Sequence, residues 1–138
     1  MSIKINTLDS NKISIPWVEK YRPNTFESII LNDNNKLIFK NILKTGIFPN
    51  LLFYGPPGTG KTTTIINLIN KYQNTYNNNK NNTNKSLILH LNASDDRGIE
   101  IIRNNISNFV SSENLFCKGL KFIILDEVDY MTKTAQLA

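Results

Sequence analysis

The chain has 138 residues, of which 40% are hydrophobic and 20% are charged, as is typical of a single globular domain. Its formal net charge of +5 is compatible with a polyanionic partner and equally with a solvated basic surface. No stretch approaches the roughly 18 consecutive apolar residues of a membrane helix, and no apolar leader follows Lys4. Because Cys117 is the single cysteine, an internal disulfide is excluded, which fits a reducing compartment. Together with the absence of a membrane helix or leader pattern, this leads us to expect a soluble intracellular protein.

The N-terminal part of the chain divides into two segments. Residues 1–15 mix isoleucine with polar residues without a clear period, and we expect them to be loose. The segment Pro16–Pro23 is bracketed by prolines, which disfavour a long helix, so we expect an extended or turn conformation there. Its aromatic side chains Trp17 and Tyr21 are also compatible with simple packing onto the domain surface.

A helix is predicted from Asn34 to Thr45. Its apolar face is expected to carry Leu37, Ile38 and Ile42. Asn32 or Asp33 is the predicted N-cap, and Gly46 is expected to end the helix.

The next segment has the pattern of a phosphate-binding loop. An apolar run, Leu51–Tyr54, predicts a strand, and Thr63–Tyr72 predicts a helix. Between them the sequence GPPGTGKT matches the pattern G-x-x-x-x-G-K-[ST]. Its glycines allow positive φ angles, which bring backbone N–H groups close to a triphosphate, and the N-terminus of the helix attracts anions.

Each position of this loop has an expected role. Lys61 is expected to reach the β- and γ-phosphates, and the Thr62 hydroxyl to ligate Mg²⁺. The residues expected to bind the nucleotide are Gly55, Pro56, Pro57, Gly58, Thr59, Gly60, Lys61, Thr62 and Thr63.

The second half of the chain alternates strand and helix patterns. The asparagine-rich residues 73–86 are interpreted as a polar insertion, and Leu87–Leu91 as a short strand in which His90 is a structural residue. A helix follows the turn residues 92–98, and its apolar face is expected to carry Ile99, Ile102, Ile106, Phe109 and Val110. Phe122–Leu125 is an unbroken apolar run of the kind found in the middle of a parallel sheet. Alternating strands and helices predict an α/β fold.

Two carboxylates follow the last apolar run. Asp126 is expected to hold Mg²⁺, directly or through water, because a carboxylate ending a strand is the usual partner of a phosphate loop. Glu127 is placed to act as the general base on the attacking water. Without the loop upstream, an acidic turn that caps a strand would be the simpler interpretation.

Four segments together resemble the small subunits of replication factor C, the AAA+ clamp loader that places a sliding clamp on primed DNA. They are Pro16–Pro23 (PWVEKYRP), Gly55–Thr62, Leu91–Ile99 (LNASDDRGI) and Ile124–Asp129 (ILDEVD). The loop alone indicates only an ATPase, whereas the first and third segments are specific to clamp loaders. The likeness runs from Trp17 to Ala138, and its details favour the subunit type numbered 3 or 5.

The resemblance implies a fold, a function and partners. The implied fold is a P-loop NTPase (AAA+) domain over residues 16–138, with a parallel sheet and flanking helices. The implied function is an ATP-binding and ATP-hydrolysing subunit of the clamp loader, with ATP and Mg²⁺ as cofactors. The implied partners are the other subunits of a hetero-pentamer, the sliding clamp PCNA and primer–template DNA, in the nucleus or another DNA-replicating compartment and away from membranes.

The resemblance also assigns roles outside the loop. It implies that Val18, Tyr21 and Arg22 lie against the adenine. It further implies that Arg97 and Arg103 contact DNA phosphates, which gives sequence-independent, salt-sensitive binding.

Leu115 and Phe116 match a region that docks on the sliding clamp, although burial beneath the sheet is an alternative for both. The chain departs from the family because the sensor, arginine-finger and collar regions are absent. The family strand that inserts between the Gly55 strand and the Asp126 strand is also absent, so we expect a fold that is incomplete at its C-terminus. Since an arginine finger contributes roughly 10³–10⁵ in rate, we expect the isolated chain to hydrolyse ATP barely above background.

Two alternatives of other classes stay open. One is a non-catalytic or truncated interaction fragment that retains the loop by descent. The other is another AAA+ DNA-processing ATPase, such as a helicase loader or a branch-migration motor, which the segment Trp17–Pro23 argues against.

Overall fold

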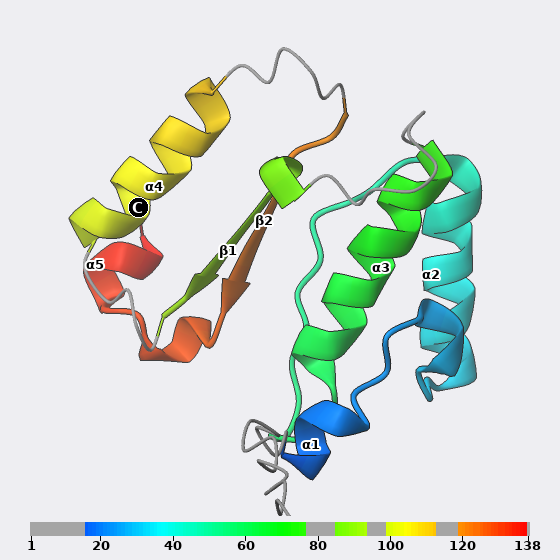
Figure 1. Cartoon of the computed structure of the whole chain (residues 1–138). Coiled ribbons are helices and arrows are strands. Elements are labelled where there is room, and N and C mark those ends of the chain that lie inside the picture. The colour runs from blue at the N-terminus through cyan, green and yellow to red at the C-terminus, as the bar shows by residue number, and fades with distance from the viewer. Residues whose placement is uncertain (1–15, 77–84, 94–98, 113–118, 138) are drawn as a thin grey trace, which may run out of the picture.

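A parallel sheet with helices on both sides forms the centre of the computed structural model, which describes residues 16–76, 85–93, 99–112 and 119–137 (Figure 1). Its helices and strands are α1 (Trp17–Lys20), α2 (Asp33–Thr45), α3 (Lys61–Tyr76), β1 (Ile88–Asn92), α4 (Ile99–Ser111), β2 (Phe122–Asp126) and α5 (Lys133–Gln136). Three 3₁₀ turns complete the list: η1 (Phe26–Ser28), η2 (Lys85–Leu87) and η3 (Val128–Tyr130). The predicted α/β class is confirmed.

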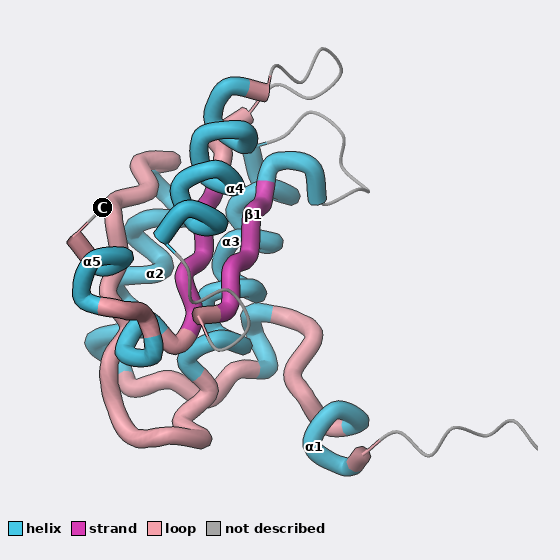
Figure 2. Tube along the Cα trace, turned by 90° about the vertical axis from the view of Figure 1, so that its left-hand side faces the viewer, coloured by secondary structure: helices cyan, strands magenta, loops and turns pink. Residues whose placement is uncertain are grey.

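The two strands pair in parallel, and their register fixes which residues are neighbours. His90 lies opposite Ile124, and Asn92 lies opposite Asp126. Helices α2 and α3 lie on one side of this sheet and α4 lies on the other (Figures 1 and 2). Among the described residues, no helix is long and apolar enough to cross a membrane.

Helix α1 corrects the prediction of an extended or turn segment. The N–H of Lys20 donates to the Pro16 carbonyl at 2.9 Å, and that of Tyr21 donates to the Trp17 carbonyl at 3.0 Å. A proline at the start of a helix is tolerated because its missing N–H would have no partner there. One helical turn therefore forms directly after Pro16.

Helix α2 begins one residue before the predicted Asn34, ends at Thr45 as predicted, and has the predicted caps. The Asn32 side chain accepts a hydrogen bond from the N–H of Asn35 at 2.8 Å, as expected of an N-cap. At the other end Gly46 has φ 71°, and its N–H donates to the Ile42 carbonyl. A Cβ at Gly46 would lie 3.0 Å from the Tyr76 ring, so both the angle and the space favour glycine.

The buried face of α2 differs from the predicted one. Phe39 and Ile42 are buried, whereas Leu37 and Ile38 are exposed. The Phe39 ring contacts those of Phe26 and Phe53, with centroids 6.2 and 5.9 Å away. These partners come from other segments. Helix α2 is therefore oriented with Phe39 toward them, and the side that carries Leu37 and Ile38 faces solvent.

The main core lies between α2, α3 and β2. Its buried residues, here called the first core cluster, are Phe39, Ile42, Leu68, Ile69, Tyr72, Phe122 and Ile124. Aromatic rings connect its parts: the Phe48 centroid lies 4.9 Å from that of Phe122 and 5.3 Å from that of Tyr72. The predicted stripe on α3 is confirmed at Ile69 and Tyr72, with Ile65 partly buried beside them.

Helix α3 is longer than predicted at both ends. It begins at Lys61, inside the loop motif, and it continues to Tyr76. The hydroxyl of Tyr76 donates to the Leu43 carbonyl at 2.8 Å, which ties this end to α2. Residues 73–76, which the sequence analysis placed in the insertion, are therefore helical, and residues 77–84 lie outside the described part.

The predicted strand at Leu51–Tyr54 does not form. The segment has no ladder partner among the described residues. Its side chains still alternate as in a strand, because Leu51 and Phe53 pack on the first core cluster while Leu52 and Tyr54 are exposed. Its sequence favours extension, but a strand also needs a neighbouring backbone to pair with.

The other side of the sheet carries a smaller core. The second core cluster consists of Leu91, Ala93, Ile102 and Met131, with Leu89 and Ile106 partly buried against it. The predicted face of α4 is correct at Ile102 and Ile106, whereas Val110 is exposed. The ammonium of Lys121 donates to the Phe109, Val110 and Ser112 carbonyls, which satisfies acceptors at the end of α4.

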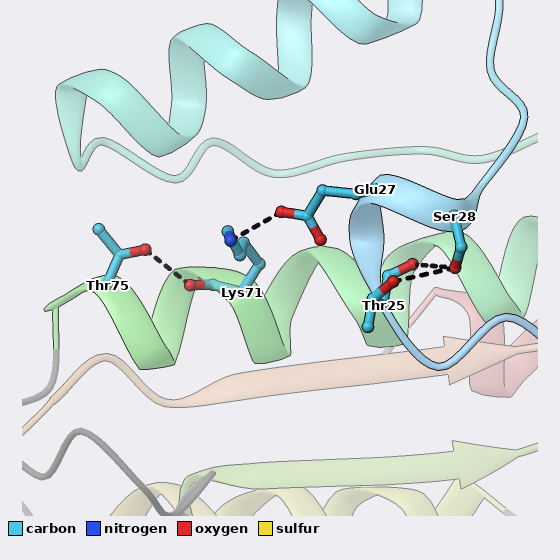
Figure 3. A network of polar contacts seen from close by, with 5 residues as sticks. All are labelled: Thr25, Glu27, Ser28, Lys71 and Thr75. Carbon is cyan, nitrogen blue, oxygen red and sulfur yellow. Dashed lines mark hydrogen bonds and ion pairs between the residues drawn. The ribbon is translucent and has the colours of Figure 1, made fainter.

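Polar contacts connect η1 to α3 (Figure 3). The Lys71 ammonium lies 2.7 Å from the Glu27 carboxylate, and Ser28 donates to the Thr25 carbonyl at 2.7 Å. The hydrogen bond from Lys71 lowers the pKa of Glu27 from its ordinary value of 4.5. Both side chains are exposed, so the contact orients the N-terminal segment rather than driving folding.

Candidate nucleotide-binding site

The phosphate-loop motif forms an exposed turn that leads directly into α3. The φ angles of Gly55, Gly58 and Gly60 are 147°, 75° and 81°, as the sequence predicted. A Cβ at Gly58 or Gly60 would meet nothing within 4 Å, so backbone angle rather than space calls for glycine there. The Thr59 hydroxyl donates to the Pro56 carbonyl at 2.9 Å and braces the turn.

Lys61 lies at the start of α3 and folds back over the loop. Its ammonium donates to the Gly55 carbonyl at 2.9 Å and to the Pro56 carbonyl at 2.8 Å. A cation is thereby held beside the loop, next to a helix N-terminus whose first N–H groups have no intrahelical acceptor. Together these groups suit a phosphate chain.

Thr62 and Asp126 meet although they are 64 residues apart in sequence. The Thr62 hydroxyl donates to Oδ2 of Asp126 at 2.9 Å, and the N–H of Glu127 donates to Oδ1 at 3.1 Å. The pairing of β2 with β1 and the packing of β2 on α3 place the carboxylate here. A hydroxyl and a carboxylate are the hard oxygen ligands that Mg²⁺ prefers, so these two residues fit the ion.

Glu127 has an unusual backbone. It is exposed and has φ 53° and ψ 42°, the left-handed region. For a residue other than glycine this conformation costs about 1–2 kcal/mol. The turn directs the chain from β2 into η3 immediately after the candidate metal ligand, so the strain lies within the candidate site.

His90 was interpreted from sequence as a structural strand residue, and its contact with the site was missed. Its Nε2 lies 3.5 Å from Oδ2 of Asp126. The contact depends on the register of β1 and β2, which no local pattern in the sequence encodes.

The proposed adenine contacts lie on and after α1. Tyr21 is 70% exposed, and its ring lies edge-on to that of Trp17 with centroids 6.4 Å apart. Arg22 is exposed as well, and Val18 belongs to α1. The segment is attached to α3 through Asn67, whose side-chain amide donates to the Pro23 carbonyl at 3.0 Å.

The remaining candidates are only partly described. Arg103 is exposed on α4, away from the second core cluster, as its place off the apolar stripe predicted. Arg97, Leu115 and Phe116 lie outside the described residues.

The sequence is similar to known proteins over nearly its whole length. Residues 9–135 match the family model described as the Rad17 P-loop domain. The chain is 46% identical to replication factor C subunit 3 of Saccharomyces cerevisiae, over 96% of this chain and 37% of the relative. It is 44% identical to the subunit 3 of Blastobotrys adeninivorans, over 98% and 38%, and 45% identical to replication factor C subunit 5 of Homo sapiens, over 91% and 35%. The chain thus spans little more than a third of the length of these relatives.

Proposed function

The chain belongs to the Rad17 P-loop domain family, and from this premise we propose that it binds Mg²⁺-ATP as part of a replication factor C subunit of type 3 or 5. The names of the similar proteins support the subunit assignment. The loop, the lysine and the paired hydroxyl and carboxylate support the ligand.

One observation carries the proposal, namely the 2.9 Å contact between Thr62 and Asp126. It joins the first turn of the loop helix to the end of β2, so the phosphate-binding and metal-binding groups form one site. An isolated glycine turn would not bring a distant carboxylate to its helix.

Each polar group in the site has a distinct role. Lys61 binds the β- and γ-phosphates once its ammonium leaves the loop carbonyls. Thr62 and Asp126 hold Mg²⁺, which neutralises charge on the phosphates when bound. Glu127 accepts a proton from the attacking water as general base. Val18, Tyr21 and Arg22 lie against the adenine, for which the exposed ring of Tyr21 provides a stacking surface.

The proposed partners follow from the subunit assignment. They are the other subunits of a clamp loader, the sliding clamp PCNA and primer–template DNA, in the nucleus or another DNA-replicating compartment. The exposed Arg103 supports a phosphate backbone as one partner, and the net charge of +5 is compatible with it. Arg97 is proposed to bind DNA beside Arg103, and Leu115 and Phe116 to contact the clamp.

Ligand-dependent melting tests the nucleotide site. With Mg²⁺-ATP at a hundredfold excess over Kd, we expect a stabilisation of about 2.7 kcal/mol. Lys61→Ala is expected to abolish the shift, whereas Lys40→Ala, which removes an exposed lysine from α2, is expected to preserve it. A folded wild-type chain whose melting ignores Mg²⁺-ATP would contradict the proposal.

Hydrolysis is tested separately from binding. We expect the isolated chain to turn over ATP barely above background, because an arginine finger from another subunit contributes roughly 10³–10⁵ in rate. Glu127→Gln is expected to retain Mg²⁺-ATP binding and to remove any residual turnover. Turnover by the isolated chain of about 1 s⁻¹ or more, the lower end of the range for kinases, would show that a finger from a partner is not needed.

A further inference from the structure

His90 approaches the candidate metal ligand from the neighbouring strand. Its Nε2 lies 3.5 Å from Oδ2 of Asp126, the same oxygen that accepts the hydrogen bond from Thr62. The distance is longer than the roughly 2.7–3.2 Å typical of an N–H···O hydrogen bond, so the two groups are close polar neighbours. The imidazole therefore lies beside the candidate metal-binding carboxylate, although His90 belongs to β1 and not to the phosphate loop or β2.

The sheet register explains this approach. His90 is opposite Ile124, and Asp126 follows Ile124 by two residues, so both side chains project from the same face as diagonal neighbours. His90 also lines a cavity of about 330 Å³, together with Ile66 of α3 and Ile88 of β1. The imidazole therefore has space beside it in which to make the small movement that a hydrogen bond to Asp126 needs.

The carboxylate of Asp126 is contacted by three segments of the chain. Oδ1 accepts the N–H of Glu127, and Oδ2 accepts the hydroxyl of Thr62. Thr62 is itself a candidate metal ligand, so its hydroxyl would turn to the ion when the metal binds. His90 is another group near Oδ2, and it can stay there in the metal-bound state. A ligand held in its binding rotamer loses less conformational entropy when it coordinates an ion.

Resting on the proposed function, we propose that His90 is a positioning residue that orients Asp126 toward Mg²⁺ by donating its ring N–H to Oδ2. It touches neither the nucleotide nor the metal. Partners of this kind typically contribute 10- to 100-fold to metal affinity. Removing the donor lowers the affinity of the nucleotide-bound site for Mg²⁺. Nucleotide binding in the absence of metal stays unchanged.

The test compares Mg²⁺ titrations of the full chain with a fluorescent ATP analogue as the probe. His90→Phe keeps a ring but removes the donor, and we expect it to raise the half-saturating Mg²⁺ concentration about tenfold. His90→Gln supplies an N–H donor and is expected to stay within about threefold of the wild type. Both variants are expected to bind the analogue in EDTA as the wild type does. If His90 had a purely structural role, its removal would weaken analogue binding in EDTA as well as in Mg²⁺.

A control and the contrary outcomes complete the experiment. Ile88→Val alters the same cavity without approaching Asp126, and its Mg²⁺ titration is expected to match the wild type. If His90→Phe fails to fold, His90→Leu gives the same donor-free comparison. An unchanged titration for the donor-free variant, or an equal shift for His90→Gln, would overturn this inference alone. A wild-type chain that binds no analogue at any Mg²⁺ concentration would overturn the proposed function as well.

Discussion

The two faces of β2 are unequally covered, although their sequence is a uniform apolar run. Phe122 and Ile124 are 6% and 8% exposed, whereas Ile123 and Leu125 are 39% and 41% exposed. The first face packs on α2 and α3 through the first core cluster, and the second faces the smaller cluster around α4. A run suited to the middle of a sheet is therefore buried on one face only in the described part of the chain.

This difference indicates which side of the molecule positions the candidate site. Thr62 lies in the first turn of α3, and Asp126 is the last residue of β2. The first core cluster connects these two elements. The α4 side contributes exposed Arg103 and no described contact to the Thr62–Asp126 pair. We therefore expect the nucleotide site to depend on the first face of β2 and to tolerate changes on the second.

Truncating neighbouring residues of β2 is the strongest test of that comparison. Phe122→Ala removes a ring that packs edge-on against those of Phe48 and Tyr72, and we expect a loss of about 3–5 kcal/mol in the free energy of unfolding. Ile123→Ala, on the opposite face, is expected to cost less than about 1 kcal/mol. Urea denaturation at constant m-value measures both. Equal losses would mean that the second face is as well packed as the first.

A buried amide on the first side gives a stabilising prediction. The side chain of Gln73 is buried, at 2% exposure, and neither of its polar atoms has a hydrogen-bond partner within the described residues. Gln73→Met preserves shape and removes the unpaired groups, so we expect a gain of about 1–2 kcal/mol in the free energy of unfolding.

Gln136→Met is the matched control for this change, since the Gln136 amide donates to the Val128 and Met131 carbonyls. Here the same substitution is expected to cost about 0.5–1 kcal/mol, measured by the same urea titration. If Gln73→Met is also destabilising, the Gln73 amide has a polar partner outside the described residues.

The hydroxyl of Tyr72 tests a polar contact inside the same cluster. It donates to the Gly46 carbonyl at 2.7 Å, and burial, with a smaller effect of Tyr76, raises its pKa above the ordinary value of 10.0. Tyr72→Phe is expected to cost about 1 kcal/mol at pH 7. Because the folded state favours the neutral phenol, this contribution is present below pH 10 and is lost as the pH rises further.

The measurement is the difference in unfolding free energy between the wild type and Tyr72→Phe, followed from pH 7 to pH 11. We expect the difference to shrink above pH 10. Tyr54→Phe removes an exposed hydroxyl and serves as the control with no change at pH 7. A difference that stays constant to pH 11 would argue against a buried, hydrogen-bonded phenol.

Features that depend on local sequence were predicted well. The cap residues of α2 at Asn32 and Gly46 are in place, and so is the phosphate loop that begins α3. Caps and glycine turns involve hydrogen bonds and φ angles within a few residues, so a short stretch of sequence specifies them. Thr62 and Asp126 are an exception among distant pairs, because the loop pattern and the carboxylate at the end of a strand led us to expect both at one Mg²⁺ ion, and the two side chains are in contact.

Features that depend on a distant partner were predicted poorly. The extended segment Leu51–Tyr54 lacks a paired neighbour in the described residues, and α2 turns Phe39 rather than Leu37 inward because rings from other segments meet it there. The contact of His90 with Asp126 requires the register of two strands. None of these partners is encoded within the segment concerned.

The Glu27–Lys71 pair is another contact between distant residues, and it gives the smallest predicted effect. Glu27→Gln is expected to reduce the free energy of unfolding by less than about 1 kcal/mol at pH 7, since both side chains are exposed. The hydrogen bond from Lys71 lowers the pKa of Glu27. Its contribution is therefore present above pH 4.5 and is lost as the pH falls below that value.

Two conditions distinguish this ion pair from a general effect of charge. In thermal melts the wild type and Glu27→Gln are expected to converge at low pH, and also at 1 M salt, where the screening length is about 3 Å. Glu100→Gln removes an exposed carboxylate from α4, on the less buried side of the sheet, and is expected to shift neither comparison. A difference between the wild type and Glu27→Gln that survives both conditions would mean that Glu27 stabilises η1 through packing. The N-terminal segment would then be held against the first face of β2 without the ion pair.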